Sequence, residues 1–169
     1  MRAPIIRPEQ SADAEAIRHV TYEAFRNKPF ADGDEHELVG VLRDSGALAV
    51  SLVADLDGSI IGHVAFSPAT VADGSAGWYA LGPASVLPEF QGAGVGSALI
   101  TEGIQQIETL GARGCILTGN RNYYARFGFK SAPELAPSNE PAEYFMIRIM
   151  GGSEPQGPFR FHEAFHGAA

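Results

Sequence analysis

Apolar residues at helical spacing predict two helices in the first quarter of the chain. The first helix begins near Ser11, and its apolar face is formed by Ile17, Val20, Ala24 and Phe25. A loop over residues 27–33 leads to a shorter helix over residues 35–43, whose predicted buried side is formed by Leu38, Val41 and Leu42. Because an amphipathic helix buries one face against another layer, both helices are expected to cover a sheet.

Stretches rich in β-forming residues predict a group of antiparallel strands. Ile5-Ile6 is a short strand, and residues 47–56 and 59–71 flank Asp57-Gly58, a dipeptide typical of a tight hairpin. A third member of the group covers residues 78–87 and is interrupted at Gly82-Pro83. Since proline cannot donate a hydrogen bond to a sheet, we expect a bulge or a splayed strand there.

The middle of the chain predicts a β-loop-α-β unit. Its helix runs from Val95 to about Leu110 and ends at Gly111 as a C-cap residue. The apolar face of this helix consists of Gly96, Leu99, Ile100, Gly103, Ile104, Ile107 and Leu110. A buried strand over residues 115–118 follows, and such a crossover makes it parallel to the strand over residues 78–87.

The last third predicts a short helix over residues 122–127 that ends at Gly128, and a final strand over residues 144–150. A tail rich in glycine and proline follows, with Phe159, Phe161 and Phe165 as candidate anchors. The pattern as a whole predicts an α/β (α+β) fold with a mixed, mostly antiparallel central sheet flanked by helices. We expect one domain over residues 1–150, with the tail over residues 151–169 packed on it.

Composition narrows the choice of function. The net charge of −8 over 169 residues argues against nucleic acid, whose phosphates are neutralised by a basic surface. No apolar run is long enough to span a bilayer, and the first residues lack the apolar stretch of a signal peptide, so we expect a cytoplasmic protein without membrane partners. The single cysteine, Cys115, lies in an apolar run and is interpreted as a buried small hydrophobic residue.

The segment from Val86 to Ser97 joins a strand end to a helix through a glycine-rich turn. Gly92, Gly94 and Gly96 let the backbone approach an anion closely, and the free N–H groups of the first helical turn point toward it. The turn therefore predicts a phosphate site. Its spacing differs from the G-x-G-x-x-G of dinucleotide-binding folds, and it lacks the Gly-Lys-Ser/Thr ending of a Walker P-loop.

The turn, Gln91-Gly-Ala-Gly94-Val-Gly96, fits Q/R-x-x-G-x-G/A and resembles the acyl-CoA pyrophosphate loop of the GCN5-related N-acetyltransferase (GNAT) superfamily. In that superfamily a valine precedes the loop, as Val86 does here, and a tyrosine stands four residues before a Gly-Phe pair. Tyr124-Ala-Arg-Phe-Gly128-Phe129 has this spacing. The chain also resembles a bacterial branch of N-acetyltransferases. Coverage is about Ile5 to Met150, with the specific motifs between Leu81 and Phe129.

The resemblance implies an N-acetyltransferase domain that moves an acetyl group from acetyl-CoA, or another short acyl-CoA, to a primary amine by direct attack, without a metal. The acceptor is open between a small molecule, a peptide terminus and a protein lysine. The loop over residues 28–33 and the tail beyond Gly151 are expected to shape its side of the site. The residues assigned to cofactor binding are Val86, Gln91, Gly92, Ala93, Gly94, Val95, Gly96, Ser97, Asn120 and Arg126.

The chemistry of transfer assigns roles to single groups. A backbone N–H at Val86 could stabilise the tetrahedral oxyanion, and the splay at Gly82-Pro83 would free the backbone for the pantetheine arm. Tyr124 is the candidate acid for the departing thiolate, whereas one residue of helical shift would bring Tyr123 there instead.

Several polar residues near the predicted site allow two interpretations each. Arg121, Arg126 and Lys130 either meet the cofactor phosphates or are solvated surface charges. Asn120 either binds the pantetheine amide or caps the following helix.

The general base is less defined by the sequence. An alkylammonium must lose a proton before it attacks, and His63, in the hairpin strand, is the candidate side chain. Its alternatives are a structural role in the core, or a base that acts through ordered water.

Two other functions compete with acyl transfer. His162-Glu163-Ala-Phe-His166 matches the H-E-x-x-H motif of zinc metalloproteases, but its neighbours are typical of a strand or a loop and no third ligand follows. A non-catalytic acyl-CoA-binding module would keep the same fold and glycine turn. A homodimer is compatible with the sequence, but no feature establishes one.

Overall fold

A computed structural model describes residues 3–26, 28, 31 and 33–166. Its sheet has the strand order β1-β2-β3-β4-β5-β7-β6, and β8 pairs with the far end of β3. The strands are β1 (Ile5–Pro8), β2 (Val50–Leu56), β3 (Ser59–Val71), β4 (Trp78–Val86), β5 (Gly114–Thr118), β6 (Lys130–Ser131), β7 (Phe145–Ile149) and β8 (Phe159–Arg160). Among the described strands only β4 and β5 pair in parallel, so the predicted mixed, mostly antiparallel sheet is confirmed.

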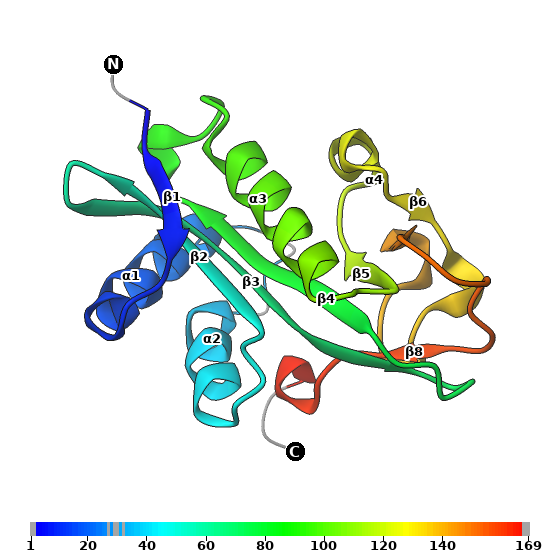
Figure 1. Ribbon diagram of the computed structural model, residues 1–169. Coiled ribbons are helices and arrows are strands. Elements are labelled where there is room, and N and C mark those ends of the chain that lie inside the picture. The colour runs from blue at the N-terminus through cyan, green and yellow to red at the C-terminus, as the bar shows by residue number, and fades with distance from the viewer. Residues whose placement is uncertain (1–2, 27, 29–30, 32, 167–169) are drawn as a thin grey trace.

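Four α-helices lie among the described residues: α1 (Ala14–Phe25), α2 (Glu35–Asp44), α3 (Val95–Thr109) and α4 (Arg121–Tyr124). In Figure 1, α3 lies over β3 and β4, and α4 lies beyond β5. Short 3-10 turns cover Ser11–Asp13, Pro88–Phe90, Ala125–Phe127, Pro133–Leu135, Ala142–Tyr144 and Glu163–His166. The helices expected near Ser11, over 95–110 and over 122–127 are therefore present. None of the described helices is long and apolar enough to cross a membrane.

The sheet buries a different layer on each face. On the face of Val64 and Phe66, here called the α3 face, α3 packs through Leu99, Ile100, Ile104 and Ile107. On the opposite face, here called the α1 face, Ile17 of α1 and Val39 of α2 pack against Val53. The C-terminal segment covers the rest of the α1 face, where Phe159 lies fully buried with its ring 4.8 Å from that of Trp78.

The predicted buried side of α2 was right for Leu42 and wrong for Val41. Val41 is 50% exposed and Leu38 is half-buried, while Val39 and Leu42 face the core. Four of the ten residues of this short helix are apolar and stand next to one another in pairs, so helical spacing fits two adjacent faces equally well. Contact with α1 and β2 selects the one that carries Val39. Leu110, at the end of α3, is likewise exposed, because the chain turns away at Gly111.

The interruption of β4 is a bulge, as expected. Val64 pairs with Ala84 and Phe66 with Leu81, so two steps along β3 span three along β4. The extra residue lies at Gly82-Pro83, whose peptide bond is cis. After the bulge the side chains of β4 change faces, so that Ser85 joins the α1 face and Val86 the α3 face beside Gly96.

Candidate active site

The sheet opens between β4 and β5. These strands pair only at Trp78, Tyr79 and Ala80, although β4 continues to Val86 and β5 to Thr118. Beyond Ala80 the edge of β4 that faces β5 makes no strand pairing with the described residues. Backbone N–H and C=O groups left unpaired in this way need a partner, and an extended amide-containing ligand can supply one.

The glycine turn closes one end of this opening. Gly92 and Gly94 have φ values of 81° and 87°, a backbone conformation that favours glycine, and Gly94 is the N-cap of α3. The Gln91 Nε2 donates a 2.9 Å hydrogen bond to the Val86 carbonyl, which ties the turn to the end of β4. Val95 is buried and anchors the helix start. The N–H groups of the first turn of α3 therefore face outward beside β4, where an anion is stabilised.

Tyr123 and Tyr124 of α4 lie across the opening from α3. The Tyr123 hydroxyl is 3.3 Å from the position that a Cβ at Gly96 would take, so this phenol reaches the first turn of α3. The Tyr124 ring packs over Gly119, where a Cβ would lie 2.7 Å from Cε2. Burial, together with the neighbouring phenol of Tyr123 and thiol of Cys115, raises the pKa of Tyr124 to about 12. Tyr124 is therefore protonated at neutral pH, as an acid must be.

The polar residues around α4 are engaged locally. The Asn120 side chain caps α4 by accepting hydrogen bonds from the N–H groups of Asn122 and Tyr123, at 2.9 and 3.4 Å. Arg126 Nε donates to the Tyr123 carbonyl, and the guanidinium lies 4.6 Å from the Tyr123 ring centre. Lys130 lies 3.8 Å from Glu154. For Asn120 the capping role is present; contact of these residues with a cofactor stays a prediction.

His63 lies on the α1 face of β3, fully buried and directly across from Ser85 of β4. Desolvation lowers the pKa of His63 to about 4, although the Glu9 carboxylate raises it. The imidazole is neutral at pH 7 for this reason. Because it is sealed from solvent, it can receive a proton from an acceptor only through an intervening group.

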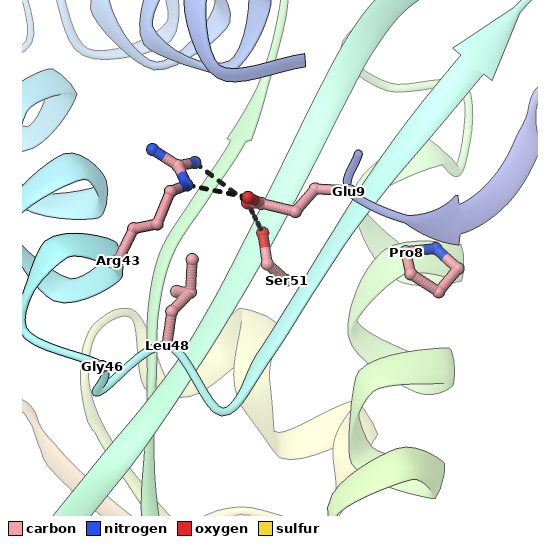
Figure 2. Close-up of a pocket in the computed structure, with 6 residues that line it drawn as sticks. All are labelled: Pro8, Glu9, Arg43, Gly46, Leu48 and Ser51. Atoms are coloured by element: carbon pink, nitrogen blue, oxygen red, sulfur yellow. Dashed lines mark hydrogen bonds and ion pairs between the residues drawn. The ribbon is translucent and has the colours of Figure 1, made fainter. Parts of the chain in front are cut away.

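The structure adds residues near His63 that sequence reasoning missed. Ser51 Oγ lies 2.7 Å from His63 Nε2 and donates a hydrogen bond to the Glu9 carboxylate, which also accepts from Arg43 Nε and Nη2 at 2.8 and 3.0 Å. Figure 2 shows Arg43 and Ser51 converging on Glu9 at a pocket of about 300 Å³. No local motif marks these residues, because they come from β2, α2 and the residue after β1.

Glu140 is a further carboxylate that the sequence did not suggest. It accepts a 2.7 Å hydrogen bond from Thr118 Oγ1 at the open end of β5. Thr118 pairs with Phe145, a residue of the buried cluster on the α1 face, so this carboxylate lies on the side of the sheet opposite α3. Since glutamate 22 positions away in sequence carries no spacing signal, only the fold places it there.

The alternative of a zinc metalloprotease has no support from the geometry of residues 162–166. Glu163–His166 form a single 3-10 turn and His162 precedes it, so the segment is not the α-helix that the H-E-x-x-H motif requires. His162 Nδ1 accepts a hydrogen bond from the Ala164 N–H. The side chain of His166 lies outside the described residues, among which no three metal-ligating side chains gather. Cys115 is buried, which raises the pKa of its thiol and fits a structural residue.

The loop expected to shape the acceptor side lies mostly outside the described residues, which include only 28, 31 and 33 of its range. The tail, in contrast, reaches the bulge of β4. A Cβ at Gly82 would be 3.7 Å from Phe165 Cε1, and the Phe165 ring stacks with Phe161 at 5.2 Å.

The chain matches known proteins both in sequence and in fold. The profile of the Acetyltransferase (GNAT) family matches residues 14–129, which include α1, the hairpin, the glycine turn and α4. The chain belongs to the GNAT acetyltransferase family. A GNAT acetyltransferase from Brucella melitensis, solved in complex with acetyl-CoA, is similar at 45% identity and a TM-score of 0.85, covering 95% of this chain and 97% of its own.

The relative YhbS from Escherichia coli supports the same family assignment in sequence and in structure. The N-acetyltransferase YhbS of strain K12 is 34% identical over 129 residues, which are 76% of this chain and 74% of YhbS. The crystal structure of YhbS in complex with CoA has a TM-score of 0.88 at 28% identity and covers 98% of this chain and 93% of that one. This GNAT acetyltransferase is therefore an N-acetyltransferase with the predicted fold, and the resemblance drawn from its motifs is confirmed.

Proposed function

We propose that this GNAT acetyltransferase transfers an acetyl group from acetyl-CoA to a primary amine by direct attack. The observation that carries the proposal is the convergence of three elements at the open end of β4. These are the unpaired strand edge after Ala80, the outward N–H groups of the α3 start, and the tyrosine pair of α4. The acetyl-CoA and CoA complexes of the Brucella and Escherichia coli relatives support the choice of cofactor.

Each element fits one part of the cofactor. The first turn of α3, with Gly92, Gly94 and Gln91 before it, would hold the pyrophosphate by backbone N–H groups and the helix dipole. The edge of β4 between the bulge and Val86 would pair with the amides of the pantetheine arm. No basic side chain is needed for either contact, which suits a chain with a net charge of −8.

The reaction forms a C–N bond and breaks the C–S bond. The amine nitrogen attacks the thioester carbon, and a backbone N–H near Val86 would stabilise the tetrahedral oxyanion. Collapse expels the CoA thiolate, which takes the phenolic proton of Tyr124, and the proton of the new amide nitrogen restores the phenol. An acceptor that begins as an ammonium releases one net proton per turnover.

The two tyrosines allow a matched test of the acid. Tyr124→Phe and Tyr123→Phe each remove one hydroxyl and keep the ring. If Tyr124 is the acid, its variant lowers kcat by about 10- to 100-fold with little change in acetyl-CoA affinity, whereas Tyr123→Phe stays within about threefold. Steady-state release of CoA thiol across a panel of primary amines measures kcat, and calorimetry measures the affinity.

Other outcomes of this experiment would point to a different acid or to a protein that binds acyl-CoA without transferring it. Unchanged turnover in Tyr124→Phe with a loss in Tyr123→Phe would move the acid to the neighbouring residue. Acetyl-CoA that binds the wild type but yields no CoA thiol with any amine would favour a non-catalytic acyl-CoA-binding module.

A further inference from the structure

A row of polar side chains crosses the α1 face of the sheet. Ser85 in β4 lies directly opposite His63 in β3, although no hydrogen bond joins the two side chains. From His63, hydrogen bonds run through Ser51 in β2 to Glu9 after β1. The neighbours of the row on this face, Val53 and Ile17, are fully buried and apolar. Burying polar groups in such a layer costs free energy unless they are hydrogen-bonded, so the row calls for an explanation.

The direction of each hydrogen bond follows from the charge of Glu9. Burial raises the pKa of Glu9, but hydrogen bonds from Arg43 and Ser51 outweigh it and hold the pKa of the carboxyl below its usual value. The carboxylate can therefore only accept hydrogen bonds, and the Ser51 hydroxyl uses its one proton to donate to it. The Ser51 oxygen must then accept from His63, which requires the tautomer with the proton on Nε2. His63 Nδ1 is left with a lone pair.

The unprotonated Nδ1 belongs to a residue that lies directly opposite Ser85 on the neighbouring strand. His63 Nδ1 and Ser85 Oγ are both buried without a hydrogen-bond partner among the described residues, and their residues are directly opposed on neighbouring strands. Ser85 immediately precedes Val86, whose backbone borders the proposed thioester site. At the other end, the Glu9 side chain is 16% exposed at the pocket of Figure 2, while His63 is sealed. Hydrogen bonds thus run from His63, the neighbour of Ser85 in β4, to solvent on the far side of β2.

We propose that Ser85, His63, Ser51 and Glu9 form a proton path that removes a proton from the acceptor ammonium and releases it at the pocket between β1, β2 and α2. This inference rests on the proposed function. The Ser85 hydroxyl first has to turn toward His63 Nδ1, with which it makes no hydrogen bond in this structure. The ammonium proton then passes to Ser85 as the Ser85 proton moves to His63 Nδ1. The Nε2 proton then moves to Ser51, and the Ser51 proton moves to the Glu9 carboxylate, which loses it to water. His63 is left with its proton on Nδ1, and this proton has to return to Nε2 before the next turnover. Glu9 and Ser51 are positioning and relay residues, because neither touches the substrate.

Deprotonation of the acceptor ammonium has a large effect on the rate at neutral pH. At pH 7 only about one in 10³ to 10⁴ molecules of an alkylammonium with a pKa near 10.4 is neutral, so a blocked deprotonation lowers the rate of attack. Arg43 has a separate role, since it keeps Glu9 ionised and oriented but carries no proton along the row.

The test compares two amines of similar size. Ethylamine is protonated at neutral pH, whereas trifluoroethylamine is mostly neutral and needs no base before it attacks. Glu9→Gln keeps an oxygen that can accept from Ser51, but it cannot take up a proton. We expect Glu9→Gln and Ser51→Ala to lower kcat/KM for ethylamine by about 10²-fold and for trifluoroethylamine by less than about threefold, with acetyl-CoA affinity unchanged. Ser51→Thr, which keeps the hydroxyl, should restore the rate.

A matched control separates chemistry from structure. Asp55, four positions after Ser51 on β2, forms a 3.1 Å ion pair with Arg7 but no contact with His63, so Asp55→Asn removes a carboxylate and leaves the row intact. It should leave both rates unchanged. Equal losses for the two amines in Glu9→Gln would assign the row a structural role and overturn the proposal, as would an unchanged rate with ethylamine.

One readout does not depend on turnover. The ¹⁵N NMR spectrum of wild-type His63 should show a protonated Nε2 and an unprotonated Nδ1, and Ser51→Ala should disturb this preference. A proton on Nδ1 would overturn the proton path even in an active enzyme. A wild type that keeps the expected tautomer but acetylates no primary amine of the panel would instead overturn the proposed function, and the path would fall with it.

Discussion

Single residues set the chemistry of the α1 face, and His63 is the clearest case. Its imidazole is fully buried, and desolvation lowers its pKa to about 4, although the charge of Glu9 opposes the shift and that of Arg43 adds to it. The unfolded chain holds the same side chain near a pKa of 6.5. Folding therefore requires a neutral imidazole, and acid opposes folding.

The free energy of unfolding should depend on pH because the pKa of His63 differs between the folded and the unfolded chain. Because the folded pKa is the lower one, the contribution of His63 is complete above pH 6.5 and is lost as the pH falls toward 4. From pH 7.5 to pH 5 we expect a loss of about 2 kcal/mol in the free energy of unfolding. Urea denaturation at both pH values measures it. His63→Gln should remove this loss, and His19→Gln, on the exposed side of α1, should retain it.

At the scale of elements, the contact between α3 and the sheet is set by a missing side chain. Gly103 lies in the middle of α3, and the Phe66 ring of β3 fills the space beside its Cα. An added Cβ would overlap the ring, whose Cζ would be only 2.7 Å away. The close approach brings the first turn of α3 against β4, and thereby positions the glycine turn.

A pair of glycine substitutions isolates this packing. Alanine is a better helix former than glycine by about 1 kcal/mol, so the overlap with Phe66 has to outweigh a gain. We expect Gly103→Ala to lower the free energy of unfolding by about 1–3 kcal/mol. Gly40→Ala in α2, where a Cβ would meet no atom within 4 Å, should raise it by up to about 1 kcal/mol. Thermal denaturation of both variants would show opposite shifts; a stabilised Gly103→Ala would contradict the close contact.

At the scale of the whole molecule, the C-terminal segment crosses back over the sheet. β8 extends the far end of β3 through pairs of Thr70 with Arg160 and Val71 with Phe159. The Phe159 ring lies between Trp78 and Phe145, at 4.8 and 5.9 Å. We propose that residues 151–169 fold together with residues 1–150 as one cooperative unit.

Cooperativity can be measured with the single tryptophan. Phe159→Ala should lower the free energy of unfolding by about 3–5 kcal/mol, because it empties a fully buried site. Phe165→Ala, at a half-buried position, should cost less. In the wild type, Trp78 fluorescence and far-ultraviolet circular dichroism should report one common transition. Separate transitions, or an unaffected Phe159→Ala, would indicate a tail that packs independently.

The sequence by itself determined the features that rest on local chemistry. The Asp57-Gly58 hairpin, the bulge at Gly82-Pro83 and the outward N–H groups after Gly94 follow from backbone conformations that few residues allow. The parallel pairing of β4 with β5 follows from the handed crossover between them. Family membership followed as well, because the glycine turn and Tyr124 are spaced by positions along the chain.

Only the tertiary structure decided what depends on contacts between distant segments. Helical spacing alone could not choose between the two apolar faces of α2, and packing against Val53 selected Val39 over Val41. The union of Glu9, Ser51 and His63 requires three neighbouring strands in a defined register, which no local pattern encodes. The burial that makes His63 a weak base and Tyr124 a weak acid is likewise a property of the packed layers, because a side chain's pKa depends on what surrounds it in space.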